Sequence, residues 1–200
     1  MPIAFELFKG TGSVGRVLER FGYEVISLDI DPRTNPTHCC DILDFNYKQY
    51  PQTYFDLVWA SPLCTEYSII KQNFGLPRNL ELADSLVLRT LEIIDYFKPR
   101  YWFIENPQSG LLKSRPFMNG LSYIDCDYCQ FGFDYRKRTR FWTNKVGLHN
   151  VLCNRKECPK IVNGKHIEGI LNHGRDGILK TRTLNDRYRI PEPLLEYLFT

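Results

Sequence analysis

No apolar run in the sequence approaches the roughly 18 residues that a membrane-spanning helix needs. The chain also begins without the basic region and short apolar stretch of a secretory signal. We therefore expect no membrane contact and an intracellular location, cytoplasmic, with the nucleus as an alternative if the protein acts in a eukaryotic cell. The sequence does not determine the oligomeric state, and a monomer is favoured.

A disulfide framework is equally disfavoured. The seven cysteines are an odd number and are spread through the whole chain. Disulfide-rich scaffolds are short secreted chains with an even number of cysteines. The pattern indicates a reducing compartment, in which thiols serve chemistry or bind metal.

Net charge is low, at +3, but the charges are unevenly placed. From Arg136 to Arg189 there are 14 Lys and Arg against 4 Asp and Glu, whereas the remainder has 12 against 19. Aromatic residues interleave with these basic residues: Tyr135, Phe141, Trp142 and Tyr188. Such a segment predicts a surface for nucleic acid, the alternative being a solvated face over ordinary aromatic packing.

The composition is sufficient for one sizeable core. Of the 200 residues, 43% are hydrophobic, and 3 Trp, 12 Tyr and 13 Phe supply large apolar side chains. A chain of this size buries enough surface for one domain and a small insert.

The first 29 residues form a strand, glycine loop, helix and strand pattern. Residues 3–8 predict a strand, residues 10–15 are rich in glycine, and residues 23–28 predict a second strand closed by Asp29. Between the first glycines of the loop and the second strand, apolar residues recur with the spacing of an amphipathic helix, at Val14, Val17, Leu18 and Phe21. Glycines allow close approach to a ligand, and a carboxylate about 20 residues further on can bind ribose hydroxyls. We predict a nucleotide-type cofactor site, and the loop alone does not separate a dinucleotide from S-adenosylmethionine.

A second strand–turn unit places a cysteine at the edge of the predicted sheet. Residues 55–60 form an apolar run, and Pro62 ends it two residues before Cys64. Open α/β sheets bind ligands at the carboxyl ends of their strands. The pattern predicts that Cys64 is a nucleophile on a rigid turn, with a small buried hydrophobe as the alternative.

Polar residues also follow the apolar strand of residues 101–104. Glu105, Asn106 and Pro107 come directly after it, at the same predicted edge as Cys64. Burial there should raise the pKa of the Glu105 carboxyl, so that it can donate a proton at neutral pH. A surface acid before a turn is the alternative.

Asp41 could bind a purine amine or cap a turn.

A basic segment follows the predicted strand of residues 123–129. Arg136, Arg138 and Arg140 lie on one side of an extended segment, because side chains in a strand alternate with a period of two. A phosphate or a polarised base carbonyl is a natural partner for them.

Four soft ligands lie in and beside the region after residue 144. They are Cys129, Cys153, Cys158 and His166. In a small segment with little helix, this set favours a structural zinc that substitutes for a hydrophobic core. Cys126 or His173 could replace one ligand, and free thiols with a solvated histidine are the alternative.

Taken in order, these motifs resemble those of the cytosine carbon-5 DNA methyltransferases over roughly residues 3–144. The resemblance rests on Phe8-Lys9-Gly10-Thr11-Gly12, Asp29, Pro62-Leu63-Cys64 with Ser68, Glu105-Asn106, and Arg136-x-Arg138-x-Arg140. Leu63, Pro107 and Arg136 depart from the family pattern. The target-recognition region is reduced to about residues 145–180, which is similar to small viral or phage members.

The resemblance implies an α/β, Rossmann-like, doubly wound fold that uses S-adenosylmethionine and methylates carbon 5 of cytosine in DNA. It implies a catalytic domain of residues 1–144 and 181–200 and a basic recognition insert of residues 145–180. Cys64 would add to carbon 6 of a flipped-out base, Glu105 would bind the ring, Asn106 would hold the turn, and Arg138 or Arg140 would offset charge at the carbonyl oxygen. The implied cofactor residues are Phe8, Gly10, Thr11, Gly12, Asp29, Ile30, Asp41, Ile42 and Pro62.

Other functions remain open at this point. RNA is an alternative substrate, because the insert is too short to reveal an element that reads duplex DNA. An amino-group methyltransferase, a nucleic-acid-binding protein that no longer catalyses, and a nicotinamide dehydrogenase are further alternatives. The dehydrogenase is the weakest, because it leaves Cys64 and Glu105 without a role.

Overall fold

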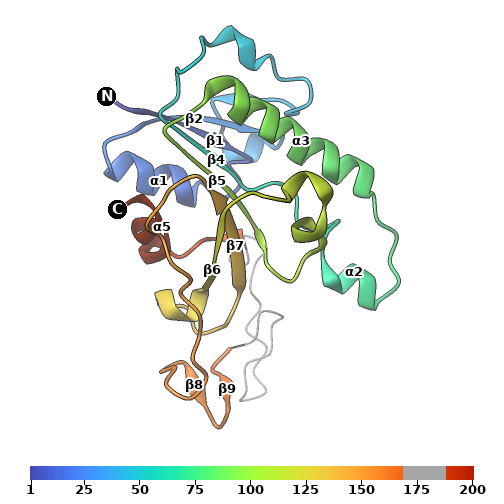
Figure 1. Ribbon diagram of the computed structural model, residues 1–200, viewed down its shortest axis with the longest axis vertical. Helices are drawn as coiled ribbons and strands as arrows, with labels where there is room; N and C mark the ends of the chain where they lie inside the picture. The colour runs from blue at the N-terminus through green and yellow to red at the C-terminus, as the bar shows by residue number, and fades with distance from the viewer. Residues whose placement is uncertain (169–187) are drawn as a thin grey trace.

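A seven-stranded mixed sheet runs through the centre of the molecule (Figure 1). The computed structural model describes residues 1–168 and 188–200. β7 pairs antiparallel with β5 and β6, and the other neighbours in the sheet are parallel. In spatial order the strands are β3 (His38–Cys39), β2 (Glu24–Asp29), β1 (Ile3–Leu7), β4 (Leu57–Ala60), β5 (Tyr101–Pro107), β7 (Arg138–Thr143) and β6 (Tyr123–Asp127).

Helices cover both faces of this sheet, as a doubly wound fold requires. Figure 1 shows α1 (Ser13–Arg20) and α5 (Glu192–Phe199) on one side and α3 (Leu80–Phe97) on the other. Side chains along β1 alternate between the two layers: Ala4 packs in the cluster with α1 and α5, whereas Phe5 packs in the cluster with α3. The predicted α/β fold class is confirmed.

Local sequence explains where these helices begin and end. At α3, the side chain of Asn79 accepts a hydrogen bond from the Leu82 amide (3.0 Å), which caps the first turn. The helix ends at Lys98, whose backbone is left-handed (φ 46°), just before Pro99. α1 follows Gly12, which has a φ of 64°. A side chain at Gly12 would strain the turn that delivers α1 to the sheet.

Two strand boundaries differ from the sequence prediction. β5 continues through Pro107 instead of ending at Ile104, because β7 pairs with it as far as Pro107 and Thr139. Glu105 and Asn106 therefore lie inside the strand, not in a turn after it. β6 ends at Asp127, and the next four residues form a 3-10 turn (Tyr128–Phe131).

The region after residue 144 contributes its own small element. β8 (Ile161–Val162) and β9 (Lys165–His166) form a two-stranded antiparallel sheet that lies beyond the β6 and β7 end of the main sheet (Figure 1). His173 and the last third of the predicted insert lie outside the described residues. None of the helices in the described part of the chain is long and apolar enough to cross a membrane.

Candidate active site

A cavity of about 520 Å³ opens at the carboxyl ends of β1, β2, β4 and β5. This edge is where parallel sheets place ligands. Ten of the predicted site residues line the cavity: Phe8, Gly10, Thr11, Asp29, Ile30, Asp41, Ile42, Pro62, Cys64 and Glu105. Gly12, Asn106, Arg138 and Arg140 are not among its described lining residues.

The carboxylate of Asp29 ties the glycine loop to the end of β2. Its Oδ2 accepts from the Gly10 amide (2.8 Å), and its Oδ1 accepts from the Asp31 amide (2.8 Å). The loop itself turns through left-handed backbone at Phe8 (φ 60°) and Gly10 (φ 50°). These contacts set the shape of the loop before any ligand arrives.

Asp41 lines the same cavity and caps a turn. Its Oδ1 accepts from the Leu43 amide (2.9 Å), which is the turn-capping contact. The residue also lines the cavity. A carboxylate has lone pairs for more than one donor, so the capping bond does not prevent binding to an amine.

Glu6 is a lining residue that the sequence analysis missed. Its side chain is buried in β1, Oε1 accepts from the Gly15 amide (3.2 Å), and Oε2 has no hydrogen-bond partner among the described residues. Burial raises the pKa of Glu6 to about 7, against the smaller lowering effect of the Gly15 hydrogen bond. A Cβ at Gly15 would stand 2.6 Å from Oε2, so a larger residue there would have to displace this carboxyl. The signal in the sequence was an acid in the middle of an otherwise apolar strand.

The Cys64 turn is fixed from the neighbouring strand. Pro62 is buried, and its carbonyl oxygen accepts a hydrogen bond from Nδ2 of Asn106 in β5 (3.1 Å). Cys64 is partly exposed to the cavity. Burial raises the pKa of the Cys64 thiol, Glu105 raises it further, and Lys137 lowers it.

Glu105 faces the same end of the cavity as Cys64. Its carboxyl is 8% exposed, and burial raises its pKa, whereas Lys137 and a hydrogen bond from Ser61 lower it. Lys137 Nζ lies 4.0 Å from Glu105 Oε1. A thiol, a buried carboxyl and an ammonium group therefore meet at one end of the cavity.

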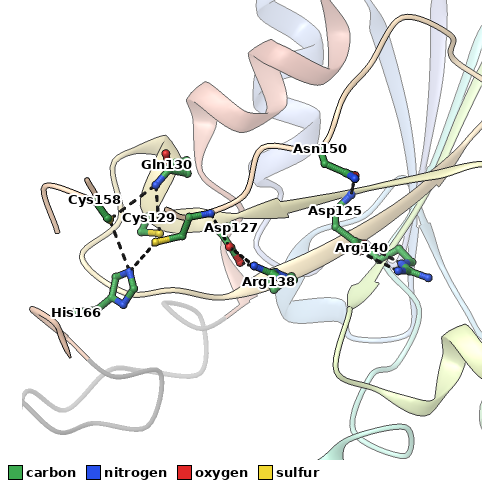
Figure 2. Close-up of polar contacts among 10 residues, drawn as sticks. Asp125, Asp127, Cys129, Gln130, Arg138, Arg140, Asn150, Cys158 and His166 are labelled. Carbon is green, nitrogen blue, oxygen red and sulfur yellow. Dashed lines mark hydrogen bonds and ion pairs between the residues drawn. The ribbon is translucent and has the colours of Figure 1, made fainter. Parts of the chain in front are cut away.

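The two arginines of β7 point to the strand beside them. Figure 2 shows Arg138 paired with Asp127 and Arg140 paired with Asp125. Both pairs are bidentate, at 3.0 and 2.7 Å for Arg138 and at 2.8 and 2.9 Å for Arg140. The arginines do share one side of an extended segment, but a role at a base carbonyl would require these aspartates to release them.

Lys137 is the second residue that the sequence analysis missed. It directly precedes β7 and lines the cavity, on the opposite side of the extended chain from Arg138. Its neighbours two and four residues on, Thr139 and Phe141, pair with Pro107 and Glu105. Only the register of β7 against β5 distinguishes this lysine from the arginines around it.

The four predicted metal ligands lie together beyond β6 (Figure 2). The ligand atoms of Cys129, Cys153, Cys158 and His166 all lie within 4.8 Å of one another. His166 Nε2 is 3.4 Å from Cys153 Sγ and 3.7 Å from Cys158 Sγ. Zinc bonds of about 2.3 Å to sulfur and 2.1 Å to nitrogen put tetrahedral ligands roughly 3.6–3.8 Å apart. This cluster could hold zinc, whereas Cys126 belongs to β6 and is not part of it.

Solved structures with this fold are methyltransferases, although no protein-family model matches the sequence. The Entamoeba histolytica methyltransferase EhMeth superposes with a TM-score of 0.55 at 17% identity, over 76% of this chain and 57% of that one. The S. pombe Dnmt2 methyltransferase gives a TM-score of 0.52 at 16% identity, over 74% and 52%. This chain thus spans just over half the length of those two proteins. The fold is that of the S-adenosylmethionine-dependent methyltransferases.

A curated protein of Frog virus 3 (isolate Goorha), named "Probable DNA (cytosine-5)-methyltransferase", resembles almost the whole sequence. The two are 31% identical over 210 aligned residues, which cover 95% of each chain. The chain therefore belongs to the DNA (cytosine-5)-methyltransferase family.

Proposed function

We propose that this protein transfers a methyl group from S-adenosylmethionine to carbon 5 of cytosine in DNA, through a covalent adduct of Cys64. The observation that carries the proposal is one cavity lined by Cys64, Glu105 and the glycine loop with Asp29. Family membership supports the reaction type. A DNA substrate would place the protein inside the cell, in the cytoplasm or the nucleus.

The residues of the cavity fit the cofactor. Asp29 would hold the ribose hydroxyls, Asp41 the purine amine, and the left-handed turn at Gly10 would pass close to the methionine part. Glu6, whose Oε2 has no hydrogen-bond partner among the described residues, lines the cavity at the carboxyl end of β1. When bound, S-adenosylmethionine supplies the methyl group as an electrophilic sulfonium. Apolar contacts would come from Phe8, Ile30, Ile42 and Pro62, which line the cavity with Thr11.

Replacing Asp41 by asparagine should weaken S-adenosylmethionine binding about tenfold, because hydrogen bonds to charged groups are worth roughly 1.5–3 kcal/mol. An amide keeps an oxygen for the Leu43 amide, so the turn stays capped. Isothermal titration calorimetry would measure the change. Asp44→Asn alters an exposed acid three residues away and is the matched control. Equal affinity of the Asp41 variant and the wild type would contradict the assignment.

The chemistry of the cytosine ring assigns the other roles. Carbon 5 is a poor nucleophile until a thiolate adds to carbon 6. The Cys64 sulfur would form that bond, while Glu105, whose pKa burial raises, would donate in its protonated form to N3 and hold the amino group. Electron density would then move to carbon 5, which takes the methyl group as the carbon–sulfur bond of the sulfonium breaks and leaves a neutral thioether. Loss of the carbon-5 proton to water would expel the Cys64 thiolate, and return of the N3 proton to Glu105 would restore the ring.

Asn106 would act through the turn and not on the base. Its hydrogen bond to the Pro62 carbonyl fixes the path of the chain two residues before Cys64. The base must leave a duplex to reach this depth. RNA, in which bases are often unpaired, is the second candidate substrate.

Duplex DNA that contains 5-fluorocytosine tests the proposal directly. Fluorine at carbon 5 blocks the proton loss that releases the enzyme, so an active Cys64 should be trapped as an adduct that survives denaturation. The band should require S-adenosylmethionine and vanish in Cys64→Ala. Exposed Cys39→Ala is the matched control and should trap normally. DNA binding without an adduct would favour RNA first and an inactive binding protein second.

We also propose that Cys129, Cys153, Cys158 and His166 hold a structural zinc. Three thiols and one imidazole are a common ligand set for closed zinc sites. Gln130 Nε2 lies 3.8 Å from both Cys129 Sγ and Cys158 Sγ, and such a donor would stabilise thiolate ligands. The cluster joins the turn after β6 to the β8–β9 sheet, in a part of the chain with little apolar core.

The family resemblance also suggests a division of the chain. Residues 1–144 and 181–200 would form the catalytic domain, and residues 145–180 would form the target-recognition insert. The described part of the insert exposes Arg155, Lys156 and Lys165, which suits a phosphate backbone. Contacts between Lys160 and Asp134 (2.8 Å), and between the Glu168 amide and the Asp134 carbonyl (3.0 Å), connect it to the segment before β7.

A further inference from the structure

We propose that Lys137 supplies the positive charge that faces Cys64 and Glu105 at the reacting end of the cavity. The inference deepens the proposed function and rests on it. Lys137 would be a positioning residue that holds the Glu105 carboxyl and favours the reactive form of the Cys64 sulfur.

Backbone pairing puts Lys137 in this position. Its carbonyl oxygen accepts a hydrogen bond from the Tyr128 amide (3.2 Å), just before β7 begins. Its side chain is only 15% exposed, and Nζ lies 4.0 Å from Glu105 Oε1 and 4.9 Å from the centre of the Tyr128 ring. The ammonium group is thus held against one carboxyl inside the cavity that Cys64 also lines.

The other basic groups nearby are engaged elsewhere. Arg138 and Arg140 each form two hydrogen bonds with one aspartate of β6. Lys9 belongs to the glycine loop, where its ammonium donates to the Asn35 carbonyl. Arg136 is exposed and is not a described lining residue of the cavity. Lys137 is therefore the described basic side chain that lies beside Glu105.

The charges around Cys64 agree with this geometry. Burial has the largest effect on the pKa of the Cys64 thiol and raises it. The Glu105 carboxylate raises this pKa further, and Lys137 opposes both effects. Lys137 likewise opposes the effect of burial on the pKa of Glu105. The remaining ionisable groups that line the cavity are Glu6, Lys9, Asp29, Asp31, Cys40, Asp41 and Tyr188.

Alkylation of Cys64 by iodoacetamide, followed by peptide mass spectrometry across pH 6–10, tests the inference in the free protein. Lys137→Gln and Lys137→Met should each shift the alkylation midpoint to higher pH. At pH 7.5 the rate should fall about three- to tenfold, because a nearby positive charge favours the thiolate form of a cysteine. Lys137→Arg should restore most of the rate.

The matched control is Arg136→Gln, which removes the same charge one residue away, outside the described lining of the cavity. It should leave the alkylation midpoint of Cys64 unchanged. The inference is overturned if both neutral variants melt like the wild type yet keep its midpoint, or if Arg136→Gln shifts the midpoint equally. Failure of the proposed function looks different: the 5-fluorocytosine adduct would be absent, while alkylation of Cys64 would still respond to Lys137.

Discussion

Replacing Glu105 by glutamine should lower the rate of methyl transfer by about 10²–10⁴-fold, the usual range for a general acid. The same variant should make Cys64 react faster with iodoacetamide. The transfer rate and the reactivity of Cys64 should change in opposite directions because the Glu105 carboxyl affects each of them differently. In its protonated form the Glu105 carboxyl would donate to the base during the reaction, whereas in its ionised form its negative charge raises the pKa of the Cys64 thiol.

Thermal unfolding gives this variant a third, independent readout. Burial raises the folded-state pKa of Glu105, so the folded protein binds this proton more tightly than the unfolded chain does. That contribution to stability is complete below the unfolded pKa, near 4.5, and is lost as pH rises through the folded value. Glu105→Gln should therefore melt at a higher temperature than the wild type at pH 8, and at nearly the same temperature at pH 4.

Glu24→Gln is the control, because Glu24 is an exposed acid at the opposite end of β2 from the cavity. It should change neither the transfer rate nor the reactivity of Cys64. If Glu105→Gln retained methyl transfer within about twofold of the wild type, a proton from this carboxyl would not be needed. Faster alkylation without loss of transfer would limit Glu105 to an electrostatic influence on Cys64.

Removing Cys158, one of the four proposed zinc ligands, should have the largest effect on the stability of the region around the cluster. Structural zinc contributes about 10–16 kcal/mol of apparent binding free energy in small zinc domains. Cys158→Ser should abolish the bound zinc found by elemental analysis and make residues 153–166 sensitive to protease. The main sheet should stay folded, because its two hydrophobic clusters contain none of the four ligands.

The consequences should extend from the cluster to the cavity. Cys129 lies eight residues before Lys137, and Cys153 donates its amide to Asp127 Oδ2 (2.8 Å), the carboxylate that also binds Arg138. Loss of metal should thus weaken DNA binding and slow adduct formation with 5-fluorocytosine DNA. Cys39→Ser, in an exposed thiol outside the cluster, is the matched control and should keep its zinc. The metal site would be contradicted if the wild-type protein contained no zinc and the Cys158→Ser variant resisted protease as well as the wild type does.

Residues whose signals are local could be located from the sequence. The Cys64 turn follows from an apolar strand and a proline, and the glycine loop follows from a strand, three glycines and a helix. The four candidate ligands can also be chosen from the sequence, which leaves Cys126 or His173 as a replacement for one of them. The two thiols lie three residues apart, and what separates them is the end of β6: Cys126 is held inside the strand, whereas Cys129 lies on the turn that reaches the cluster.

The sequence by itself determined the α/β fold, the edge of the sheet that carries the site and the family to which the chain belongs, because each depends on short-range pattern and motif order. Only the tertiary structure decided which cation stands beside Glu105. Lys137 and Arg138 are adjacent in the chain, and their side chains point in opposite directions. The long-range pairing of β7 with β5 selects Lys137 for the cavity, and the pairing with β6 gives the arginines to Asp125 and Asp127. The pairing of β7 with β5 joins residues more than 30 positions apart along the chain, and no local pattern encodes it.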